Sequence, residues 1–280
     1  MSIHKVYSYR QDEVEIPDNP QRLVSFSPSI TEILFELGLS EQIVGISAFC
    51  VRPPETSGKR KIGSYGFVRR EILDELRPDL IFTISGYQDK FTAELAKSYP
   101  VVCVELPVSL AGIIDLPVKI GIITGKREEG RKLSYSLMKS LPSPRREIVG
   151  SCYLEIDLAS PIAFGAFSYI TDALRYMGLR SIYSDQNREW IPSSLDFVHS
   201  ADPDIIIYEA KMFSKYTEQD LEETIKNRGW SDLKAVRNKM VFKTPGNLDF
   251  FAHHGPSFIR EVMPWLEDKV RRLQESPGKQ

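Results

Sequence analysis

Residues 22–39 have the sequence Arg22-Leu-Val-Ser-Phe-Ser-Pro-Ser-Ile-Thr-Glu-Ile-Leu-Phe-Glu-Leu-Gly-Leu39. The first five residues are mostly apolar and precede a Ser-Pro-Ser turn, which predicts a short buried strand over Arg22–Phe26. The residues that follow place apolar side chains at i, i+3, i+4 and i+7 and reach Gly38, a pattern typical of an amphipathic helix that ends at a glycine. Ser29 followed by Glu32 predicts a capping box at the start of this helix.

The helical part of this segment has a second copy in Tyr169-Ile-Thr-Asp-Ala-Leu-Arg-Tyr-Met-Gly-Leu179. A second pair of similar segments is Arg77-Pro-Asp-Leu-Ile-Phe82 and Asp202-Pro-Asp-Ile-Ile-Ile207. Each member of this pair predicts a helix that ends at Pro-Asp and a buried strand that begins there. Because both features recur in the same order, the sequence predicts two related lobes.

The predicted fold class is α/β: two lobes with mostly parallel sheets, joined by a long connecting helix, with a ligand cleft between the lobes. Short runs rich in Val, Ile or Phe alternate with helical patterns, and strands separated by helices form parallel sheets that helices cover. Lys5–Tyr9 and Glu13–Ile16 predict an edge hairpin. Further predicted strands are Ile43–Ile46, Asp79–Ile84, Val101–Val104, Ile148–Ile156, Asp204–Tyr208 and Met240–Phe242.

The middle segment, Ser109–Leu141, has little strand pattern and contains two helical stretches. Pro117 predicts that the first of them is short or kinked. We interpret this segment as a helical connector, which divides the chain into an N-terminal α/β lobe at residues 1–107, a connector at 108–145 and a C-terminal α/β lobe at 146–280. The alternative is an ordinary crossover helix inside one domain.

Composition excludes several classes of protein. Lys and Arg number 36 against 38 Asp and Glu, a net charge of −2. A nearly neutral chain lacks the basic field that nucleic-acid binding requires, so no nucleic-acid partner is expected. No apolar run approaches the roughly 18 residues of a membrane span. The first residues lack the apolar core of a signal peptide, so the protein is expected to be cytoplasmic or to have had its export signal removed.

The sequence contains none of the common catalytic motifs, and no catalytic residue is assigned. GxSxG, HExxH, a Walker-type phosphate loop and GxGxxG after a strand are all absent. The adjacent His253 and His254 cannot both face a metal from one side of a helix. One of them, His253 or His254, is the candidate axial ligand to a bound metal; a solvated loop or a packing role is the alternative.

Aromatic and small polar residues follow the predicted strands in both halves of the chain. In open α/β sheets the loops after the carboxyl ends of the strands form the ligand crevice. A single aromatic residue at such a place is more often part of the core, but the set together fits a wide, flat, partly apolar ligand. Arg52 would attract carboxylate or catecholate oxygens, or is a surface arginine beside Pro53. The predicted ligand-binding residues are Ser27, Ser29, Arg52, Tyr65, Phe67, Tyr87, Ser168, Tyr169, Trp190, Phe213 and Phe251.

Several motifs together resemble a known family over about residues 13–270. They are the 22–39 segment, Val44-Gly-Ile46, Cys50 with Pro53-Pro54, Ile62-Gly63, Leu76-Arg-Pro-Asp-Leu-Ile81, Trp190 with Asp196, Asp202-Pro-Asp204, Trp230-Ser-Asp-Leu-Lys-Ala-Val236 and Gly255-Pro256. The chain resembles the cobalamin and ferric-siderophore substrate-binding proteins of ABC importers, which have a helical backbone between two lobes.

The resemblance implies roles for individual residues. Glu71 and Asp196 match the acidic residues, one per lobe, that dock onto arginines of the membrane permease; the alternative is that each complements a helix dipole. Trp190 matches an aromatic residue that packs on the corrin ring in the cobalamin-binding branch. Tyr65 or Phe67 lies near the facing aromatic position of the first lobe, where the tryptophan of the best-known branch is absent.

The function expected from these observations is that of a non-enzymatic receptor for a metal chelate, which it delivers to an ABC importer permease. A corrinoid such as cobalamin is the favoured ligand, because aromatic residues outnumber cations in the predicted crevice; a ferric siderophore or haem comes next. No cofactor is required, and a monomer is expected. The resemblance implies a periplasmic or cell-surface location. The alternative is a cytoplasmic corrinoid- or metal-chelate-handling protein, such as an enzyme of related architecture.

Overall fold

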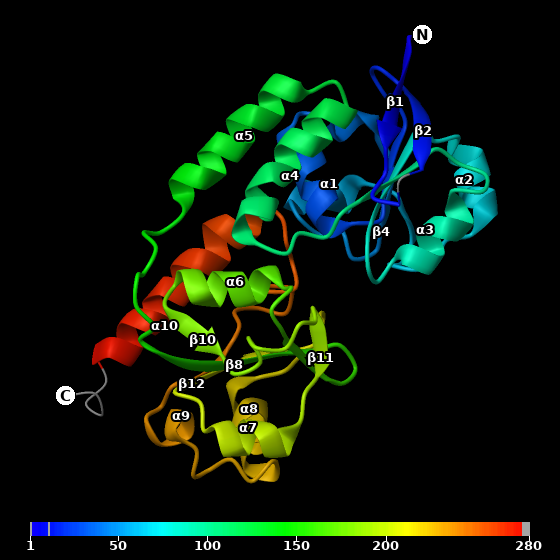
Figure 1. Cartoon of the computed structure of the whole chain (residues 1–280). Helices are drawn as coiled ribbons and strands as arrows, with labels where there is room; N and C mark the ends of the chain where they lie inside the picture. The colour runs from blue at the N-terminus through cyan, green and yellow to red at the C-terminus, as the bar shows by residue number, and fades with distance from the viewer. Residues whose placement is uncertain (1, 11, 276–280) are drawn as a thin grey trace. The chain divides into compact units, whose positions relative to one another are not determined.

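The computed structural model describes residues 2–10 and 12–275 of the chain. The chain divides into two compact units, each with its own sheet (Figure 1). Unit 1 comprises Met1–Leu106 and Ile113–Lys139, and unit 2 comprises Pro107–Gly112 and Ser140–Gln280. Of the helices within the described residues, none combines the length and the apolar character needed to cross a bilayer.

Unit 1 is built on a five-stranded sheet in the order β5-β4-β3-β6-β7, in which all neighbouring strands are parallel. The hairpin of β1 and β2 is a separate antiparallel pair. Because the five strands run the same way, their carboxyl ends and the loops that follow lie along one edge of the sheet. The elements are β1 (Ile3–Tyr7), β2 (Glu13–Pro17), β3 (Leu23–Ser25), α1 (Pro28–Glu36), η1 (Ser40–Gln42), β4 (Ile43–Ser47), η2 (Pro54–Gly58), β5 (Lys61–Gly63), α2 (Arg70–Leu76), β6 (Leu80–Ile84), α3 (Asp89–Leu95), β7 (Val101–Val104), α4 (Leu110–Ile123) and α5 (Arg127–Ser140).

Unit 2 is built on a mixed sheet in the order β11-β9-β8-β12-β13, with β10 also paired to β8. Strands β8, β10, β12 and β13 are parallel; β9 is antiparallel to β8, and the edge strand β11 is antiparallel to β9. The elements are β8 (Gly150–Asp157), β9 (Pro161–Phe164), α6 (Tyr169–Tyr176), β10 (Leu179–Ser181), β11 (Trp190–Pro192), α7 (Leu195–Ala201), β12 (Ile205–Glu209), α8 (Glu218–Asn227), α9 (Lys234–Arg237), β13 (Val241–Lys243), the π-helical turn η3 (Phe258–Val262) and α10 (Met263–Glu275).

The predicted helical repeat is present as helices α1 and α6. Both are followed by a glycine in the left-handed region, Gly38 at φ +74° and Gly178 at φ +80°. The predicted capping box at Ser29 and Glu32 is wrong, because α1 begins at Pro28 and its N-cap residue is Ser27. Proline favours the first helical position, since its missing N–H would be unpaired there in any case. Ser29 therefore lies inside the first turn of the helix.

The segment predicted as a connector contains two helices of 14 residues each, α4 and α5. Helix α4 continues through Pro117, so it is not short. Within unit 1 the backbones of the two helices approach closely at Gly130, where a Cβ atom would lie 2.3 Å from the carbonyl oxygen of Pro117. Only glycine fits at such a contact, and the close packing of α5 supports α4 around its proline.

Candidate functional site

An aromatic patch lies at the carboxyl edge of the unit 1 sheet. It consists of Phe49, Tyr65 and Tyr87, which follow β4, β5 and β6. The ring centroids of Phe49 and Tyr65 are 5.2 Å apart, and those of Tyr65 and Tyr87 are 6.3 Å apart and nearly perpendicular. Tyr87 is 70% exposed. Such edge-to-face and tilted pairs hold the rings in a definite arrangement.

The turn that carries Tyr65 depends on a glycine. The N–H of Ser64 donates to the carbonyl oxygen of Phe67 at 2.8 Å, and the N–H of Ala48 donates to the carbonyl oxygen of Gly63 at 2.8 Å. A Cβ atom on Gly63 would lie 2.1 Å from the carbonyl oxygen of Phe67, so a side chain does not fit there. Phe67 is at the end of the same turn and is exposed.

Ser27 and Ser29 lie at the start of α1, beneath the surface of unit 1. Both are fully buried, and their hydroxyl oxygens are 3.0 Å apart. The hydroxyl of Thr31 lies within hydrogen-bond distance of both the carbonyl oxygen of Ser27 and the thiol of Cys50. Burial raises the pKa of the Cys50 thiol to about 11. These groups form a buried hydroxyl cluster rather than part of the exposed patch. Arg52 is half-buried in the loop after β4.

In unit 2 the predicted ligand residues fall into two groups. Ser168 caps α6 by accepting the N–H of Ile170 at 3.2 Å, and it is buried. Tyr169 is also buried, and its hydroxyl donates to the carbonyl oxygen of Phe251, which is buried as well. The second group is exposed or half-buried: it consists of Trp190, at the start of β11, and Phe213, in the loop after β12.

A buried carboxylate holds the loop that precedes the two histidines. Glu209, at the end of β12, accepts the backbone N–H groups of Phe250, Phe251 and Ala252. Burial raises the pKa of Glu209 to about 7, Asp249 adds to this effect, and the three N–H groups oppose it. Glu209 was assigned no role from the sequence, because its partners are more than forty residues away in the chain.

His253 and His254 are both buried in unit 2. Burial and the neighbouring His253 lower the pKa of His254 to about 3, so its ring is neutral at ordinary pH. The His254 ring lies 5.8 Å from that of Tyr169. Within residues 2–10 and 12–275, no three His, Cys, Asp or Glu side chains are grouped as a metal ion would need.

Glu71 and Asp196 occupy equivalent places in the two units. Each is exposed in the first turn of a seven-residue helix, α2 or α7. The two helices end alike, at residues in the left-handed region, Arg77 at φ 45° and Asp202 at φ 42°. Their surroundings differ: Arg69 and Arg70 precede Glu71, whereas Leu195 and Phe197 flank Asp196.

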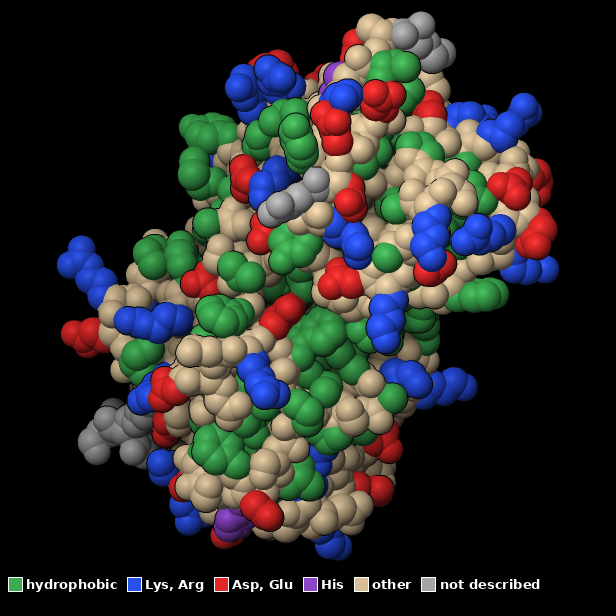
Figure 2. Space-filling view, turned by 45° about the vertical axis from the view of Figure 1, so that its right-hand side comes forward, with side chains coloured by type: hydrophobic (Ala, Val, Ile, Leu, Met, Phe, Trp, Pro, Cys, Tyr) green, Lys and Arg blue, Asp and Glu red, His purple; other side chains and the backbone are tan. Residues whose placement is uncertain are grey.

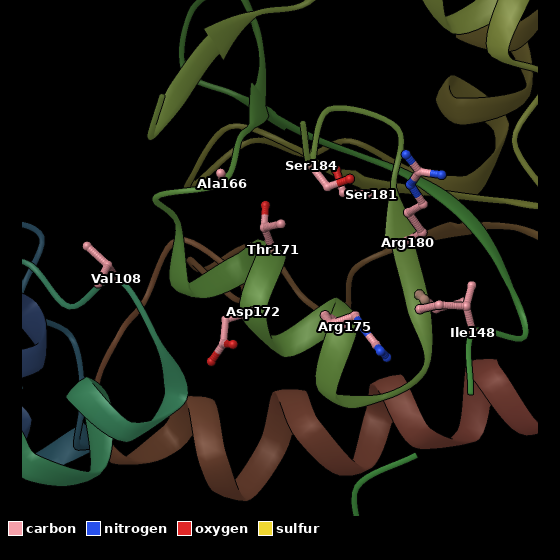
Figure 3. A pocket seen from close by; sticks show the side chains of 10 residues that line it. Val108, Ile148, Ala166, Thr171, Asp172, Arg175, Arg180, Ser181 and Ser184 are labelled. Carbon is pink, nitrogen blue, oxygen red and sulfur yellow. The ribbon is translucent and has the colours of Figure 1, made fainter. Parts of the chain in front are cut away.

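A separate pocket lies in unit 2, between the segment before α4 and helix α6 (Figure 3). Its volume is about 370 Å³, and Thr171 rises toward Ser181 and Ser184 on one side of it. Asp172 accepts the backbone N–H of Leu110 at 2.8 Å and so ties this segment to α6. The pocket contains none of the predicted ligand residues; its lining is Val108, Ile148, Ala166, Thr171, Asp172, Arg175, Leu179, Arg180, Ser181 and Ser184.

On the face seen in Figure 2, basic and acidic groups are interspersed. This distribution agrees with the net charge of −2.

Comparison with known proteins identifies the family. A model of the periplasmic binding protein family matches residues 23–248. An uncharacterized ABC transporter substrate-binding lipoprotein of Bacillus subtilis is 23% identical over 262 residues, which are 89% of this chain and 80% of that protein.

Solved structures show the same fold. The periplasmic vitamin B12-binding protein of Vibrio cholerae has a TM-score of 0.73 at 17% identity, with 92% of this chain and 99% of that chain covered. The periplasmic heme-binding protein of Roseiflexus sp. RS-1 has a TM-score of 0.70 at 20% identity, with 89% and 99% covered. The resemblance found in the sequence is confirmed, and the chain belongs to the periplasmic binding protein family.

Proposed function

We propose that this protein is the substrate-binding component of an ABC importer and that its ligand is a broad, flat metal chelate, with a corrinoid favoured. The observation that carries the proposal is the aromatic patch of Phe49, Tyr65 and Tyr87 at the carboxyl edge of a parallel sheet. The names of the relatives in B. subtilis and V. cholerae support substrate binding for an importer and a corrinoid ligand, respectively.

The chemistry of the patch favours a ring system over an anionic siderophore. Aromatic faces bind large apolar surfaces with little loss of side-chain entropy. A catecholate siderophore needs several cations, and the nearby Lys61 already donates to the backbone oxygen of Cys50 at 2.6 Å. The candidate cation for an acidic group at the rim of the ligand is Arg52, whose guanidinium suits carboxylate oxygens. Haem is the second choice, and the name of the Roseiflexus relative supports it.

We propose that the remaining parts of the expected site act as follows. Trp190 packs on the ring of the ligand. Glu71 and Asp196 contact arginines of a permease, and their equivalent positions on α2 and α7 support this role. Two exposed carboxylates contribute little to stability but orient an encounter and increase its rate. The protein then acts on the outer side of the cytoplasmic membrane and transforms nothing chemically.

Titration calorimetry of the full chain tests the proposal with three probes: cyanocobalamin, haem and a ferric catecholate siderophore. Cyanocobalamin is expected to bind with a Kd of roughly 1 μM or tighter, about −8 kcal/mol. Binding of haem or the siderophore alone would overturn the corrinoid assignment. If none of the three binds more tightly than roughly 100 μM, about −5.5 kcal/mol, the receptor function itself is wrong.

A further inference from the structure

The side chain of Gln88 joins three separate parts of unit 1. It is fully buried just before α3. Its Nε2 donates to the carbonyl oxygen of Phe26 at 3.1 Å and to that of Tyr65 at 2.6 Å. Its Oε1 accepts the N–H of Ile84 at 2.8 Å. One amide therefore links the ends of β3 and β6 to the turn that carries Tyr65.

We propose that Gln88 is a positioning residue for ligand binding: it fixes the Tyr65 ring against Phe49 and Tyr87 and so sets the affinity of the aromatic patch. The inference rests on the proposed function, because it treats the patch as the ligand surface. Gln88 itself is buried and does not touch the ligand.

The backbone hydrogen bonds of the turn fix its shape and tie its first residue, Gly63, to Ala48 after β4, whereas Gln88 ties Tyr65 to β3 and β6. The bond from Ser64 to Phe67 closes the turn on itself. The bonds of Gln88 instead reach 23 residues back to Tyr65 and 62 residues back to Phe26, across the edge of the sheet. A small shift of Tyr65 relative to β6 would change its contact with Tyr87, which lies directly before Gln88 in the chain.

Only an amide of this length supplies the bonds that the site uses. A glutamine offers two N–H donors and a carbonyl acceptor. Ionised glutamate has no donor, so both carbonyl oxygens, of Phe26 and Tyr65, would lose their partner. Methionine has nearly the same shape but makes none of the three bonds, and it leaves buried polar groups unpaired.

Gln88→Met and Gln88→Glu test the inference, with Thr92→Val as the matched control. Thr92 is buried on α3, the helix that Gln88 precedes, and donates to the hydroxyl of Thr83 at 2.8 Å, away from the turn. Three measurements are made on each full-length variant: the Kd for cyanocobalamin, the near-UV circular dichroism of the ligand-free protein, and Tm.

We expect Gln88→Met to weaken cyanocobalamin binding at least 10-fold and to change the tyrosine band of the near-UV spectrum. Thr92→Val should lower Tm comparably while keeping Kd within about twofold of wild type. A folded Gln88→Met protein with wild-type Kd and spectrum would overturn the inference; if it does not fold, Gln88→Glu is judged by the same criteria. Should wild type bind no probe, the proposed function fails, and the spectra still decide whether Gln88 positions Tyr65.

Discussion

Asp79 and Asp204 make matching hydrogen bonds in their two units. The N–H of Asp79 donates to the carbonyl oxygen of Arg22 at 3.1 Å, and its carboxylate accepts the N–H of Arg22 at 2.9 Å. The N–H of Asp204 donates to the carbonyl oxygen of Ser151 at 3.1 Å, and its carboxylate accepts the N–H of Ser151 at 2.8 Å. Each aspartate thus fastens the start of one central strand to its neighbour. The Pro-Asp pair that recurs in the sequence therefore makes the same backbone hydrogen bonds in both units.

Replacing either aspartate by alanine should destabilise the protein. At Asp204 the change leaves the backbone N–H of the half-buried Ser151 without its acceptor, which costs about 1–3 kcal/mol of unfolding free energy. At Asp79 the partner Arg22 is exposed, so the loss should lie at the lower end of this range. Urea unfolding of Asp79→Ala and Asp204→Ala measures this loss. The control is Asp185→Ala, because Asp185 is exposed and contacts the exposed Arg180 and the hydroxyl of the neighbouring Ser184, so it should change stability by less than about 1 kcal/mol. Equal effects for all three variants would contradict the prediction.

Breaking a buried ion pair in unit 2 should lower the free energy of unfolding by more than either aspartate variant does. Arg228 donates to both oxygens of Glu155 at 2.7 and 2.8 Å, and Glu155 is only 1% exposed. Arg228→Met leaves the carboxylate buried without its cation and should cost about 3–5 kcal/mol. Adding Glu155→Gln to the same chain should recover part of this loss, because the uncompensated charge is then gone. A double variant no more stable than Arg228→Met would refute the explanation.

Glu209 predicts a pH dependence of stability with a definite sign. Burial raises its pKa from 4.5 to about 7 in the folded protein. Between these pH values the folded state binds more protons than the unfolded state. The contribution of Glu209 to the free energy of unfolding is therefore fully present below pH 4.5 and is lost as the pH rises through about 7. The total is about 3 kcal/mol at 1.36 kcal/mol per pH unit.

The measurement is the difference in unfolding free energy between wild type and Glu209→Gln, taken from pH 4.5 to pH 8. The difference should fall steadily as pH rises. The pKa of Glu189 is also raised to about 7 by burial, so the slope of wild type alone does not isolate Glu209, whereas the difference does. A difference that is flat across this range would show that Glu209 is already ionised at pH 5.

Gly63 predicts a link between a backbone turn and ligand affinity. A Cβ atom at Gly63 would collide with the carbonyl oxygen of Phe67, whereas at Gly66, in the same turn, it would meet nothing within 4 Å. Gly63→Ala should therefore displace Tyr65 and weaken cyanocobalamin binding at least 10-fold, about 1.4 kcal/mol. Gly66→Ala is the matched control and should bind like wild type. Calorimetry of both variants decides; equal affinities would show that the turn does not position the ligand surface.

Much of the fold followed from local pattern. Strand β7 has the predicted bounds, and most other predicted strands differ from the observed ones by one or two residues at their ends. Strands β5, β9, β10 and β11 were missed because each is only three or four residues long and includes a charged residue or a proline (Lys61, Pro161, Arg180 and Pro192), whereas the equally short β3, β7 and β13 lie in apolar runs. The pairing that makes them strands comes from neighbours distant in the sequence.

The residues around the candidate site were harder to sort from sequence. A position after a strand does not tell an exposed ring such as Tyr87 from a buried one such as Phe251, because both follow apolar runs. No sequence motif or pattern marked Gln88 or Glu209 as important. Their roles lie in hydrogen bonds to backbone groups 62 and 41 residues away, and no motif of side chains records such bonds.

The aromatic patch itself yields the most direct prediction. Tyr65→Ala and Tyr87→Ala each remove a ring from the proposed ligand surface, and buried aromatic contacts of this kind typically contribute about 1–3 kcal/mol to binding. Cyanocobalamin affinity should therefore fall roughly 10- to 100-fold in each variant. Tyr135→Ala is the control, because Tyr135 is an exposed tyrosine on α5 that contacts Lys139 and no other ring among the described contacts. Tyr87 is so exposed that its loss should leave Tm nearly unchanged, which separates a binding defect from unfolding. If Tyr87→Ala and Tyr135→Ala bind cyanocobalamin equally well, the ligand surface lies elsewhere on the protein.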